Sequence, residues 1–143
     1  MKKTESGEII RFGVSMDEVL LSKFDELITS RGYTNRSEAI RDLVRAELVK
    51  ESWAKGKTSQ VALLGLVYRH EHGDLMHRLM HLQHEHAQLI ISNLHVHLDS
   101  DNCLEVLILK GPTETIEHLA EQLLSTKGVK FGQLMRATTG KEI

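Results

Sequence analysis

Apolar and polar residues alternate near the start of the chain and then recur with helical spacing. Over residues 9–16 every second residue is apolar, which is typical of a strand with one buried face. Two segments follow, one ending near Gly32 and the other opening at Tyr33, in which apolar residues recur three and four positions apart. Asn35 or Ser37 is a suitable cap for the second of these helices. Residues 1–50 are therefore predicted to follow the order β-α-α.

The strand expected at residues 9–16 has no obvious neighbour in the nearby sequence. A single strand is unstable because its backbone N–H and C=O groups remain unpaired. It either joins a sheet formed later in the chain or pairs with the same strand of a second chain. Its brevity and its position ahead of two helices favour the second possibility, so we expect the domain formed by residues 1–50 to be dimeric.

The rest of the chain predicts a second domain. Residues 51–60 are polar and contain glycine and serine, which indicates a linker before a domain spanning residues 61–143. Strand patterns cover 61–70, 89–98, 103–110 and, more weakly, 129–139, and helical patterns cover 73–87 and 111–128. The order β-α-β-β-α-β is ferredoxin-like, so the whole chain is assigned to the α+β class.

Composition says more about the cellular environment of the protein than about its biochemical activity. The formal net charge of −2 gives no argument for nucleic-acid binding, so DNA binding must be argued from particular residues. We expect a cytoplasmic protein without membrane association, because no long apolar run or signal sequence is visible and a single cysteine excludes an internal disulfide. Histidine is unusually frequent, with nine in the chain.

The sequence LHVHLDSDNC at residues 94–103 contains three candidate metal ligands. His95 and His97 would point to the same face of a strand, about 7 Å apart. A turn centred near Ser100 places Cys103 opposite His97, with Cβ atoms about 5 Å apart. Imidazole and thiolate are ligands that nickel, copper and zinc prefer. The alternative is a surface strand with solvated histidines and an inert cysteine.

The preceding helix offers a fourth ligand. His77, His81 and His84 lie at i, i+4 and i+7 and therefore share one helical face. The spacing does not decide which of them completes a four-coordinate site, and His77 with His81 could form a weak surface site by themselves. The remaining histidines are expected to be solvated: His70, His72, His86 and His118.

Three segments together resemble the nickel-responsive transcriptional regulators, the NikR family. They are RGYTNRSEAIRDLVR (31–45), QHEHAQL (83–89) and LHVHLDSDNCLEVLILKG (94–111), and the resemblance extends from about Arg11 to Gln133. It implies an N-terminal ribbon-helix-helix domain whose paired strands enter the major groove of DNA. It also implies an ACT-like C-terminal domain that assembles the regulator into a homotetramer, a dimer of dimers.

The resemblance also assigns residues to DNA. Arg11, Gly13 and Ser15 match the family's base-reading positions, although Gly13 departs from a pattern that usually has a hydroxyl side chain there. Ser15 begins the sequence Ser-Met-Asp-Glu and could instead cap the first helix. The residues that open the second helix are suited to holding a phosphate: Asn35, Arg36 and Ser37.

The metal ligands implied by the resemblance are His84, His95, His97 and Cys103, with His84 contributed by a neighbouring subunit. Glu105 matches a family position behind the ligands, or is simply a charge on a strand face. Glu38 and Asp42 match a secondary cation site, or belong to a solvated acidic helix face. Three imidazoles and a thiolate suit a planar Ni(II) site, whereas zinc would prefer them tetrahedral.

These expectations combine into a nickel-gated regulator, with repression of nickel uptake as its expected role, that recognises palindromic half-sites in an operator duplex. Two alternatives are a copper- or zinc-responsive regulator and an ACT-domain regulator that senses a small organic ligand. A metalloenzyme is disfavoured because four protein ligands leave no vacant coordination position and no acid–base pair stands out.

Overall fold

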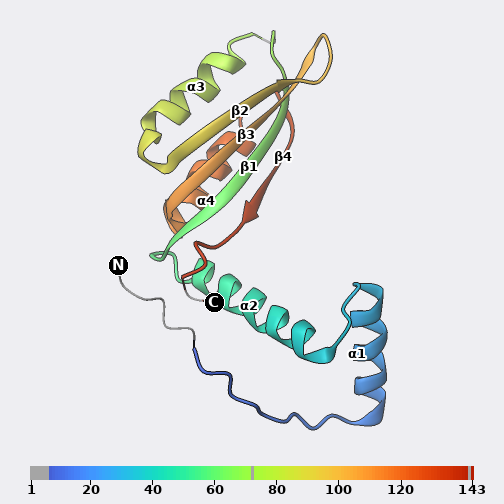
Figure 1. Cartoon of the computed structure of the whole chain (residues 1–143). Helices are drawn as coiled ribbons and strands as arrows, with labels where there is room; N and C mark the ends of the chain where they lie inside the picture. The colour runs from blue at the N-terminus through green and yellow to red at the C-terminus, as the bar shows by residue number, and fades with distance from the viewer. Residues whose placement is uncertain (1–6, 72, 142) are drawn as a thin grey trace. The chain divides into compact units, whose positions relative to one another are not determined.

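The computed structural model describes residues 7–71, 73–141 and 143, and the chain divides into two compact units. The first unit ends at Leu43 and the second begins at Val44, so the boundary lies within one long helix. Figure 1 shows both units along the chain.

The first unit contains the two predicted helices, α1 (Glu18–Ser30) and the start of α2 (Arg36–Ala54). Asn35 Oδ1 accepts a hydrogen bond from the Glu38 backbone N–H at 2.9 Å, so Asn35 rather than Ser37 caps α2. The cap of α1 is Asp17, whose Oδ1 accepts from the Leu20 N–H at 3.0 Å. The helix-cap interpretation of Ser15 was therefore wrong, since Asp17 supplies the same acceptor one residue before the helix begins.

Residues 9–16 form no strand within one chain. The only sheet among the described residues is built from four other segments, which excludes the possibility that residues 9–16 join the later sheet. Phe12 is 75% exposed, and the alternating apolar side chains on either side of it are exposed as well: Ile10, Val14 and Met16. Pairing with the same segment of a second chain stays a prediction.

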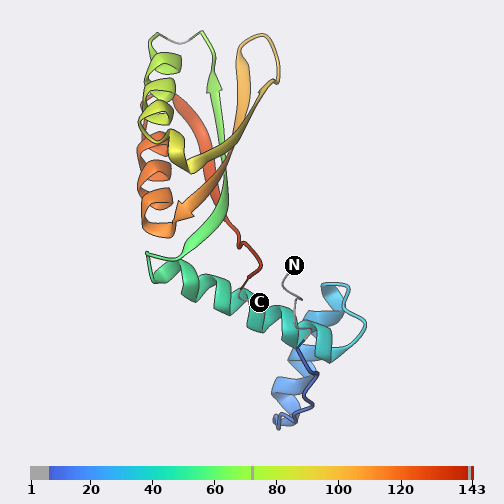
Figure 2. The ribbon, with the colours of Figure 1, turned by 60° about the vertical axis from the view of Figure 1, so that its left-hand side comes forward.

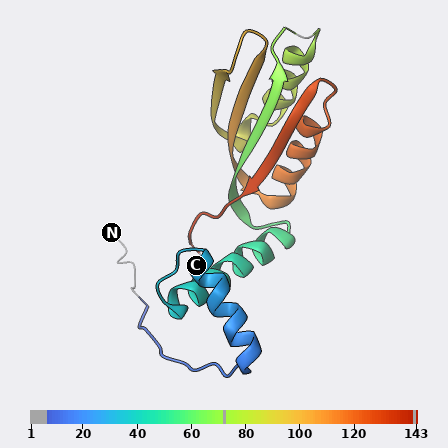
Figure 3. The ribbon, with the colours of Figure 1, turned by 90° about the vertical axis from the view of Figure 1, so that its right-hand side faces the viewer.

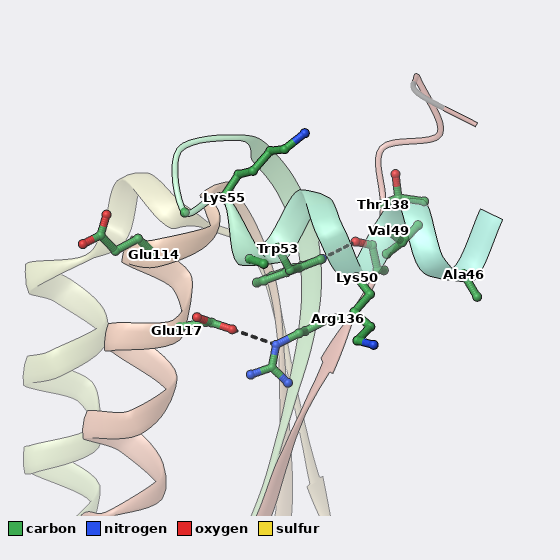
Figure 4. Close-up of a pocket in the computed structure, with 12 residues that line it drawn as sticks. Ala46, Val49, Lys50, Trp53, Lys55, Glu114, Glu117, Arg136 and Thr138 are labelled. Carbon is green, nitrogen blue, oxygen red and sulfur yellow. Dashed lines mark hydrogen bonds and ion pairs between the residues drawn. The ribbon is translucent and has the colours of Figure 1, made fainter. Parts of the chain in front are cut away.

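The linker expected at residues 51–60 is partly structured. Helix α2 continues to Ala54, strand β1 (Ser59–Arg69) begins at Ser59, and Ser52 and Trp53 are both buried. The Trp53 indole N–H donates to the Ala137 carbonyl at 2.9 Å, with the Arg136 guanidinium over its ring (Figure 4). The Gln60 side-chain amide donates to the Ser52 hydroxyl, and its oxygen accepts from the Thr139 N–H, contacts that the composition of the segment does not reveal.

The second unit has the ferredoxin-like order predicted from the sequence. Its sheet has the strand order β2-β3-β1-β4, and every neighbouring pair is antiparallel (Figures 1 and 3). A short 3₁₀ turn precedes the second strand. The elements after β1 are α3 (Leu75–Glu85), β2 (Ile90–His97), β3 (Asn102–Pro112), α4 (Thr113–Leu124) and β4 (Val129–Arg136).

Helices α3 and α4 cover one face of the sheet, as Figure 2 shows. Every second side chain of β1 and β3 is buried on this face, where leucines from strands and helices form the core. The opposite face is also apolar but is not covered by a helix. Its outer strands leave large side chains in solvent, such as Phe131, which is 65% exposed, together with Leu94, Val96 and Met135.

Candidate metal centre

The β2–β3 hairpin has the register that the sequence predicts. His97 lies opposite Cys103, and His95 lies opposite Glu105. The hairpin therefore places both histidines and the thiol on one face of the sheet. The face is the one that carries the buried side chains of β3, and along it Cys103 is buried, His95 is partly buried and His97 is exposed.

Asp99 holds the hairpin turn. Its Oδ1 accepts hydrogen bonds from the backbone N–H groups of Asp101 and Asn102, both at 2.8 Å, and the Asn102 side chain donates to the same carboxylate. These bonds lower the pKa of Asp99 to about 2, with the Asn102 side chain as the largest cause. The turn keeps Cys103 in register with His97.

Replacing Asp99 with alanine is expected to lower the urea midpoint of the metal-free protein at pH 5, because the turn loses its acceptor. The folded-state pKa of Asp99 lies below its unfolded value of 3.8, so its contribution is present above about pH 4 and is lost as the pH falls towards 2. The difference in midpoint between wild type and D99A should therefore be smaller at pH 3 than at pH 5. Asp99→Asn, which cannot titrate, is the control, and an equal difference at both pH values would contradict the assignment.

One group of ligand atoms is already assembled within the chain. The ligand atoms of His70, His97 and Cys103 all lie within 4.8 Å of one another. The His70 ring meets the His97 ring edge to face, with centroids 5.2 Å apart, and the His95 ring lies 5.1 Å from that of His97. Among the described residues this is where three such side chains converge closely enough for a metal ion.

His70 was expected to be solvated, and the structure corrects that interpretation. It follows the end of β1, which pairs with β3 so that Tyr68 lies opposite Cys103. The His70 backbone N–H donates to the Asp101 carbonyl at 3.1 Å, which extends the pairing to the hairpin turn. The ferredoxin-like strand order was the available signal, because it places the end of the first strand beside the start of the third.

Of the two remaining predicted ligands, His95 lies beside this group and His84 lies outside it. His95 is partly buried and contacts the ring of Tyr68 edge to face, with centroids 6.3 Å apart. His84, near the end of α3, is exposed and lies outside the group formed within this chain. The sequence expectation assigned His84 to the site of a neighbouring subunit, and that assignment stays a prediction.

Cys103 is fully buried. Burial raises the pKa of its thiol, and the nearby negative charges of Glu105 and Asp99 raise it further. The thiol is therefore protonated at neutral pH in the metal-free chain. A thiolate ligand must lose that proton, so metal binding at Cys103 is coupled to proton release.

Glu105 is 5% exposed and connects four elements behind the hairpin. Its Oε2 accepts from the Tyr68 hydroxyl at 2.6 Å, and its Oε1 accepts from the Gln83 and Asn93 side-chain amides at 2.8 and 2.7 Å. Burial and the bond to Glu105 raise the pKa of Tyr68 well above its usual value, so this hydroxyl stays a donor. Gln83 precedes His84, so the network ties the helix that carries one predicted ligand to the hairpin that carries the others.

The donors at this site fit a divalent ion of intermediate softness. Imidazole nitrogens and one thiolate suit nickel, copper or zinc, whereas the all-oxygen ligands preferred by magnesium and calcium are not found in this group. The Nδ1 atom of His70 is buried and has no hydrogen-bond partner among the described residues. A buried, unpaired imidazole nitrogen is costly unless something occupies the position that it faces.

In the first unit, the residues predicted to contact DNA differ in their exposure and in their bonding partners. Arg11, Gly13 and Ser15 are exposed. The Arg36 guanidinium donates to both carboxylate oxygens of Asp25, each at 2.7 Å, which raises the pKa of Arg36 and lowers that of Asp25. Arg36 therefore joins α2 to α1 in this structure, rather than projecting freely from the start of the helix.

Two more of the predicted residues are already engaged. The Tyr33 hydroxyl donates to Asp42 at 2.8 Å, so one oxygen of that carboxylate is occupied. This bond raises the pKa of Tyr33. Asn35 uses its side-chain oxygen for the helix cap.

No helix among the described residues is long and apolar enough to cross a membrane.

Fold and site together define a class: a ferredoxin-like domain with a histidine–cysteine cluster that could hold a metal ion, preceded by a helical unit. Family models agree with both parts. The NikR C terminal nickel binding domain matches residues 61–137, and the ribbon-helix-helix protein of the copG family matches residues 10–51. The chain belongs to the family of nickel-responsive transcriptional regulators, a family of regulators and not of enzymes.

Curated relatives match the chain along nearly its whole length. One from Geotalea uraniireducens (strain Rf4) is 52% identical over 137 residues, covering 96% of this chain and 99% of the relative. Another, from Pyrococcus furiosus, is 49% identical over 135 residues, covering 94% and 98%. Both carry the name "Putative nickel-responsive regulator".

Among solved structures, the fold is similar to that of an uncharacterized protein, TM1266, from Thermotoga maritima. The TM-score is 0.50 at 18% identity, and the match covers 55% of this chain and 96% of the other. At that identity the similarity concerns the fold alone.

Proposed function

We propose that this chain is a cytoplasmic, sequence-specific DNA-binding repressor of nickel uptake that binds its operator when loaded with Ni(II). The observation that carries the proposal is the hairpin register, which places His97 opposite Cys103 with His95 on the same face, in a chain of the nickel-responsive family.

The proposed nickel ligands are His95, His97 and Cys103 of one subunit and His84 of its neighbour. The exposure of His84 leaves it accessible to a second chain, and the Glu105–Gln83 hydrogen bond fixes the end of the helix on which it lies. Bound Ni(II) would supply a planar four-coordinate centre that joins two subunits. Asp99 and Glu105 would hold the hairpin ligands in place for that centre.

The proposed dimer forms through residues 9–16. Their alternating apolar side chains are exposed in one chain, and a second copy of the same segment would pair with the backbone and cover them. The opposite side of this ribbon would present Arg11, Gly13 and Ser15 to the major groove. Support for the role of Ser15 comes from the cap at Asp17, because the Ser15 hydroxyl is not needed to cap α1.

The proposed tetramer, a dimer of dimers, forms through the C-terminal units. The sheet face opposite α3 and α4 carries apolar side chains from all four strands, and its exposed members include Phe131 and Leu94. An uncovered apolar surface of this kind is typical of a protein interface. In such an assembly two ribbons would be available for two palindromic half-sites.

Near the DNA, the backbone N–H groups at the start of α2 would bind a phosphate, with Asn35 and Ser37 beside them. Arg36 would contribute its charge while remaining paired with Asp25. Glu38 and Asp42 lie one helical turn apart on α2, and we propose them for a secondary cation, with one Asp42 oxygen already bonded to Tyr33.

The coupling between metal and DNA has a defined thermodynamic form. If Ni(II) increases operator affinity by a given factor, operator DNA must increase Ni(II) affinity by the same factor. The test is to enrich duplexes from a randomised pool with Ni(II)-loaded protein, and then to titrate Ni(II) with the enriched duplex and with a scrambled one. Equal enrichment with and without Ni(II) would contradict the proposal.

Arg11→Ala is expected to weaken binding of the enriched duplex by about 10-fold to 100-fold, since a bidentate arginine–guanine contact contributes roughly 1–3 kcal/mol of discrimination. Binding to the scrambled duplex should fall much less. Lys23→Ala, which removes a charge from exposed α1, is the matched control and should lower both affinities by similar factors. An equal loss on both duplexes for Arg11→Ala would mean that Arg11 contacts only the backbone of DNA.

A further inference from the structure

We propose that Gly13 leaves one base pair of each operator half-site unread, so that any base pair is tolerated between those contacted by Arg11 and Ser15. The inference deepens the proposed function and rests on it in one respect, because it requires the ribbon formed by residues 9–16 to lie in the major groove. It concerns the sequence of the operator and is independent of the metal ligands.

The first argument is the position of Gly13 along the segment. The alternating apolar side chains of residues 9–16 are exposed in one chain, and their face is the one that a second copy of the segment would cover in the proposed dimer. In an extended strand, residues 11, 13 and 15 lie on the opposite face. Gly13 is therefore the middle of three positions that face DNA, and adjacent positions on this face are about 7 Å apart.

The second argument is that one chain, over its described residues, does not require a glycine at residue 13. The φ angle of Gly13 is not positive, so its backbone is open to residues with side chains. A Cβ atom added to Gly13 would meet no described heavy atom within 4 Å, and the residue is exposed. Glycine also weakens a strand, because it loses more backbone entropy than other residues on ordering. The effect of the missing side chain therefore falls on the face toward DNA.

The third argument is what a glycine presents to the groove. In a paired ribbon the backbone N–H and C=O groups point sideways, towards neighbouring strands, and not towards the faces of the ribbon. Sequence in the major groove is read by hydrogen bonds to base edges and by apolar contact with the thymine methyl group. Gly13 has no side chain for either contact, so the four base pairs are equivalent at the position that it faces.

The neighbouring positions are different. Arg11 and Ser15 are both exposed, and each carries hydrogen-bonding groups on the same face. The Ser15 hydroxyl is not used for the helix cap, which Asp17 supplies. Each chain therefore reads its half-site at two positions separated by an unread one, and operators that differ only at the unread position should bind equally.

The experiment compares the duplexes that Ni(II)-loaded, full-length wild type and Gly13→Thr enrich from a randomised pool. Threonine adds a hydroxyl and a methyl group, both of which can contact base edges in the major groove. Wild type should enrich half-sites with all four base pairs at similar frequency at one position, whereas Gly13→Thr should prefer one base pair there by at least about threefold. Because all sequences compete for the same protein, this ratio does not depend on how strongly the ribbon pairs.

Gly7→Thr is the matched control, since Gly7 is also exposed, with no described heavy atom within 4 Å of an added Cβ, but precedes the predicted strand. It should enrich the same sequences as wild type. Arg11→Ala and Ser15→Ala locate the unread position, because each should lose the preference for one of the base pairs that flank it.

The proposal is overturned if wild type already prefers one base pair at every position between those two, or if Gly13→Thr enriches the same sequences as wild type. It is also overturned if Gly13→Thr loses the enriched duplex but keeps its affinity for a scrambled one, because Gly13 would then be needed for close approach to the bases. Failure of the proposed function is separate: it would appear as wild-type enrichment that is the same with and without Ni(II), whatever the base preference at this position.

Discussion

Replacing Cys103 with alanine is expected to abolish the nickel-dependent gain in operator affinity and to lower Ni(II) affinity by about 100-fold or more. The substitution removes the only thiolate of the proposed centre, and removing a residue that merely supports a ligand already costs 10-fold to 100-fold. Charge-transfer absorption from thiolate to nickel should disappear as well. Ni(II) titrations followed by absorbance and by operator binding measure both effects.

Two readouts separate this result from misfolding. Cys103 is fully buried but small, so alanine leaves little empty volume, and the circular dichroism spectrum and the metal-free affinity for non-specific DNA should not change. His118→Ala, at an exposed position on α4, should retain the nickel response. A Cys103→Ala protein that keeps its nickel-dependent operator binding would contradict the proposed centre and would favour a regulator that senses a different ligand.

The second large effect is expected for Glu105→Ala, which should lower the free energy of unfolding by about 2–4 kcal/mol, because three hydrogen-bond donors lose their acceptor and the Tyr68 hydroxyl lies in the core. It should also lower Ni(II) affinity by about 10-fold to 100-fold, since the carboxylate holds the hairpin against the helix that carries His84. Urea unfolding and Ni(II) titration, at one fixed protein concentration, measure the two effects.

Glu105→Gln is the control for this prediction. The amide has nearly the shape of the carboxylate and keeps one acceptor oxygen, so most of the stability and most of the Ni(II) affinity should remain. If Glu105→Ala loses stability while its Ni(II) affinity is unchanged, Glu105 supports the core alone and has no influence on the metal ligands.

The sequence predicted the order of the second domain because its segments differ clearly in period. Strands β1 and β3 are buried on one face and partly buried on the other, whereas α3 and α4 carry a single apolar stripe, so each pattern matches one type of element. The hairpin register also followed from the sequence, since a short turn around Ser100 leaves few ways to pair the two strands.

The linker and the caps were harder to predict. Composition made residues 51–60 appear solvated, but Ser52 and Trp53 are buried. Ser52 accepts a hydrogen bond from Gln60 within the same segment, whereas Trp53 donates to Ala137, which lies 84 positions further along the chain. Ser15 and Asp17 both have suitable side chains for capping α1, and only the position at which the helix begins decided between them.

By itself, the sequence determined the fold class, the hairpin register and the family, because these depend on local periodicity and on motifs that are continuous in the chain. Only the tertiary structure decided that His70 joins His97 and Cys103, and that Glu105 binds Tyr68, Gln83 and Asn93. These contacts join residues between 12 and 37 positions apart along the chain, or at the ends of different strands. Their formation depends on which strands are neighbours in the sheet and on which face each side chain occupies, and neither property is encoded in a local pattern.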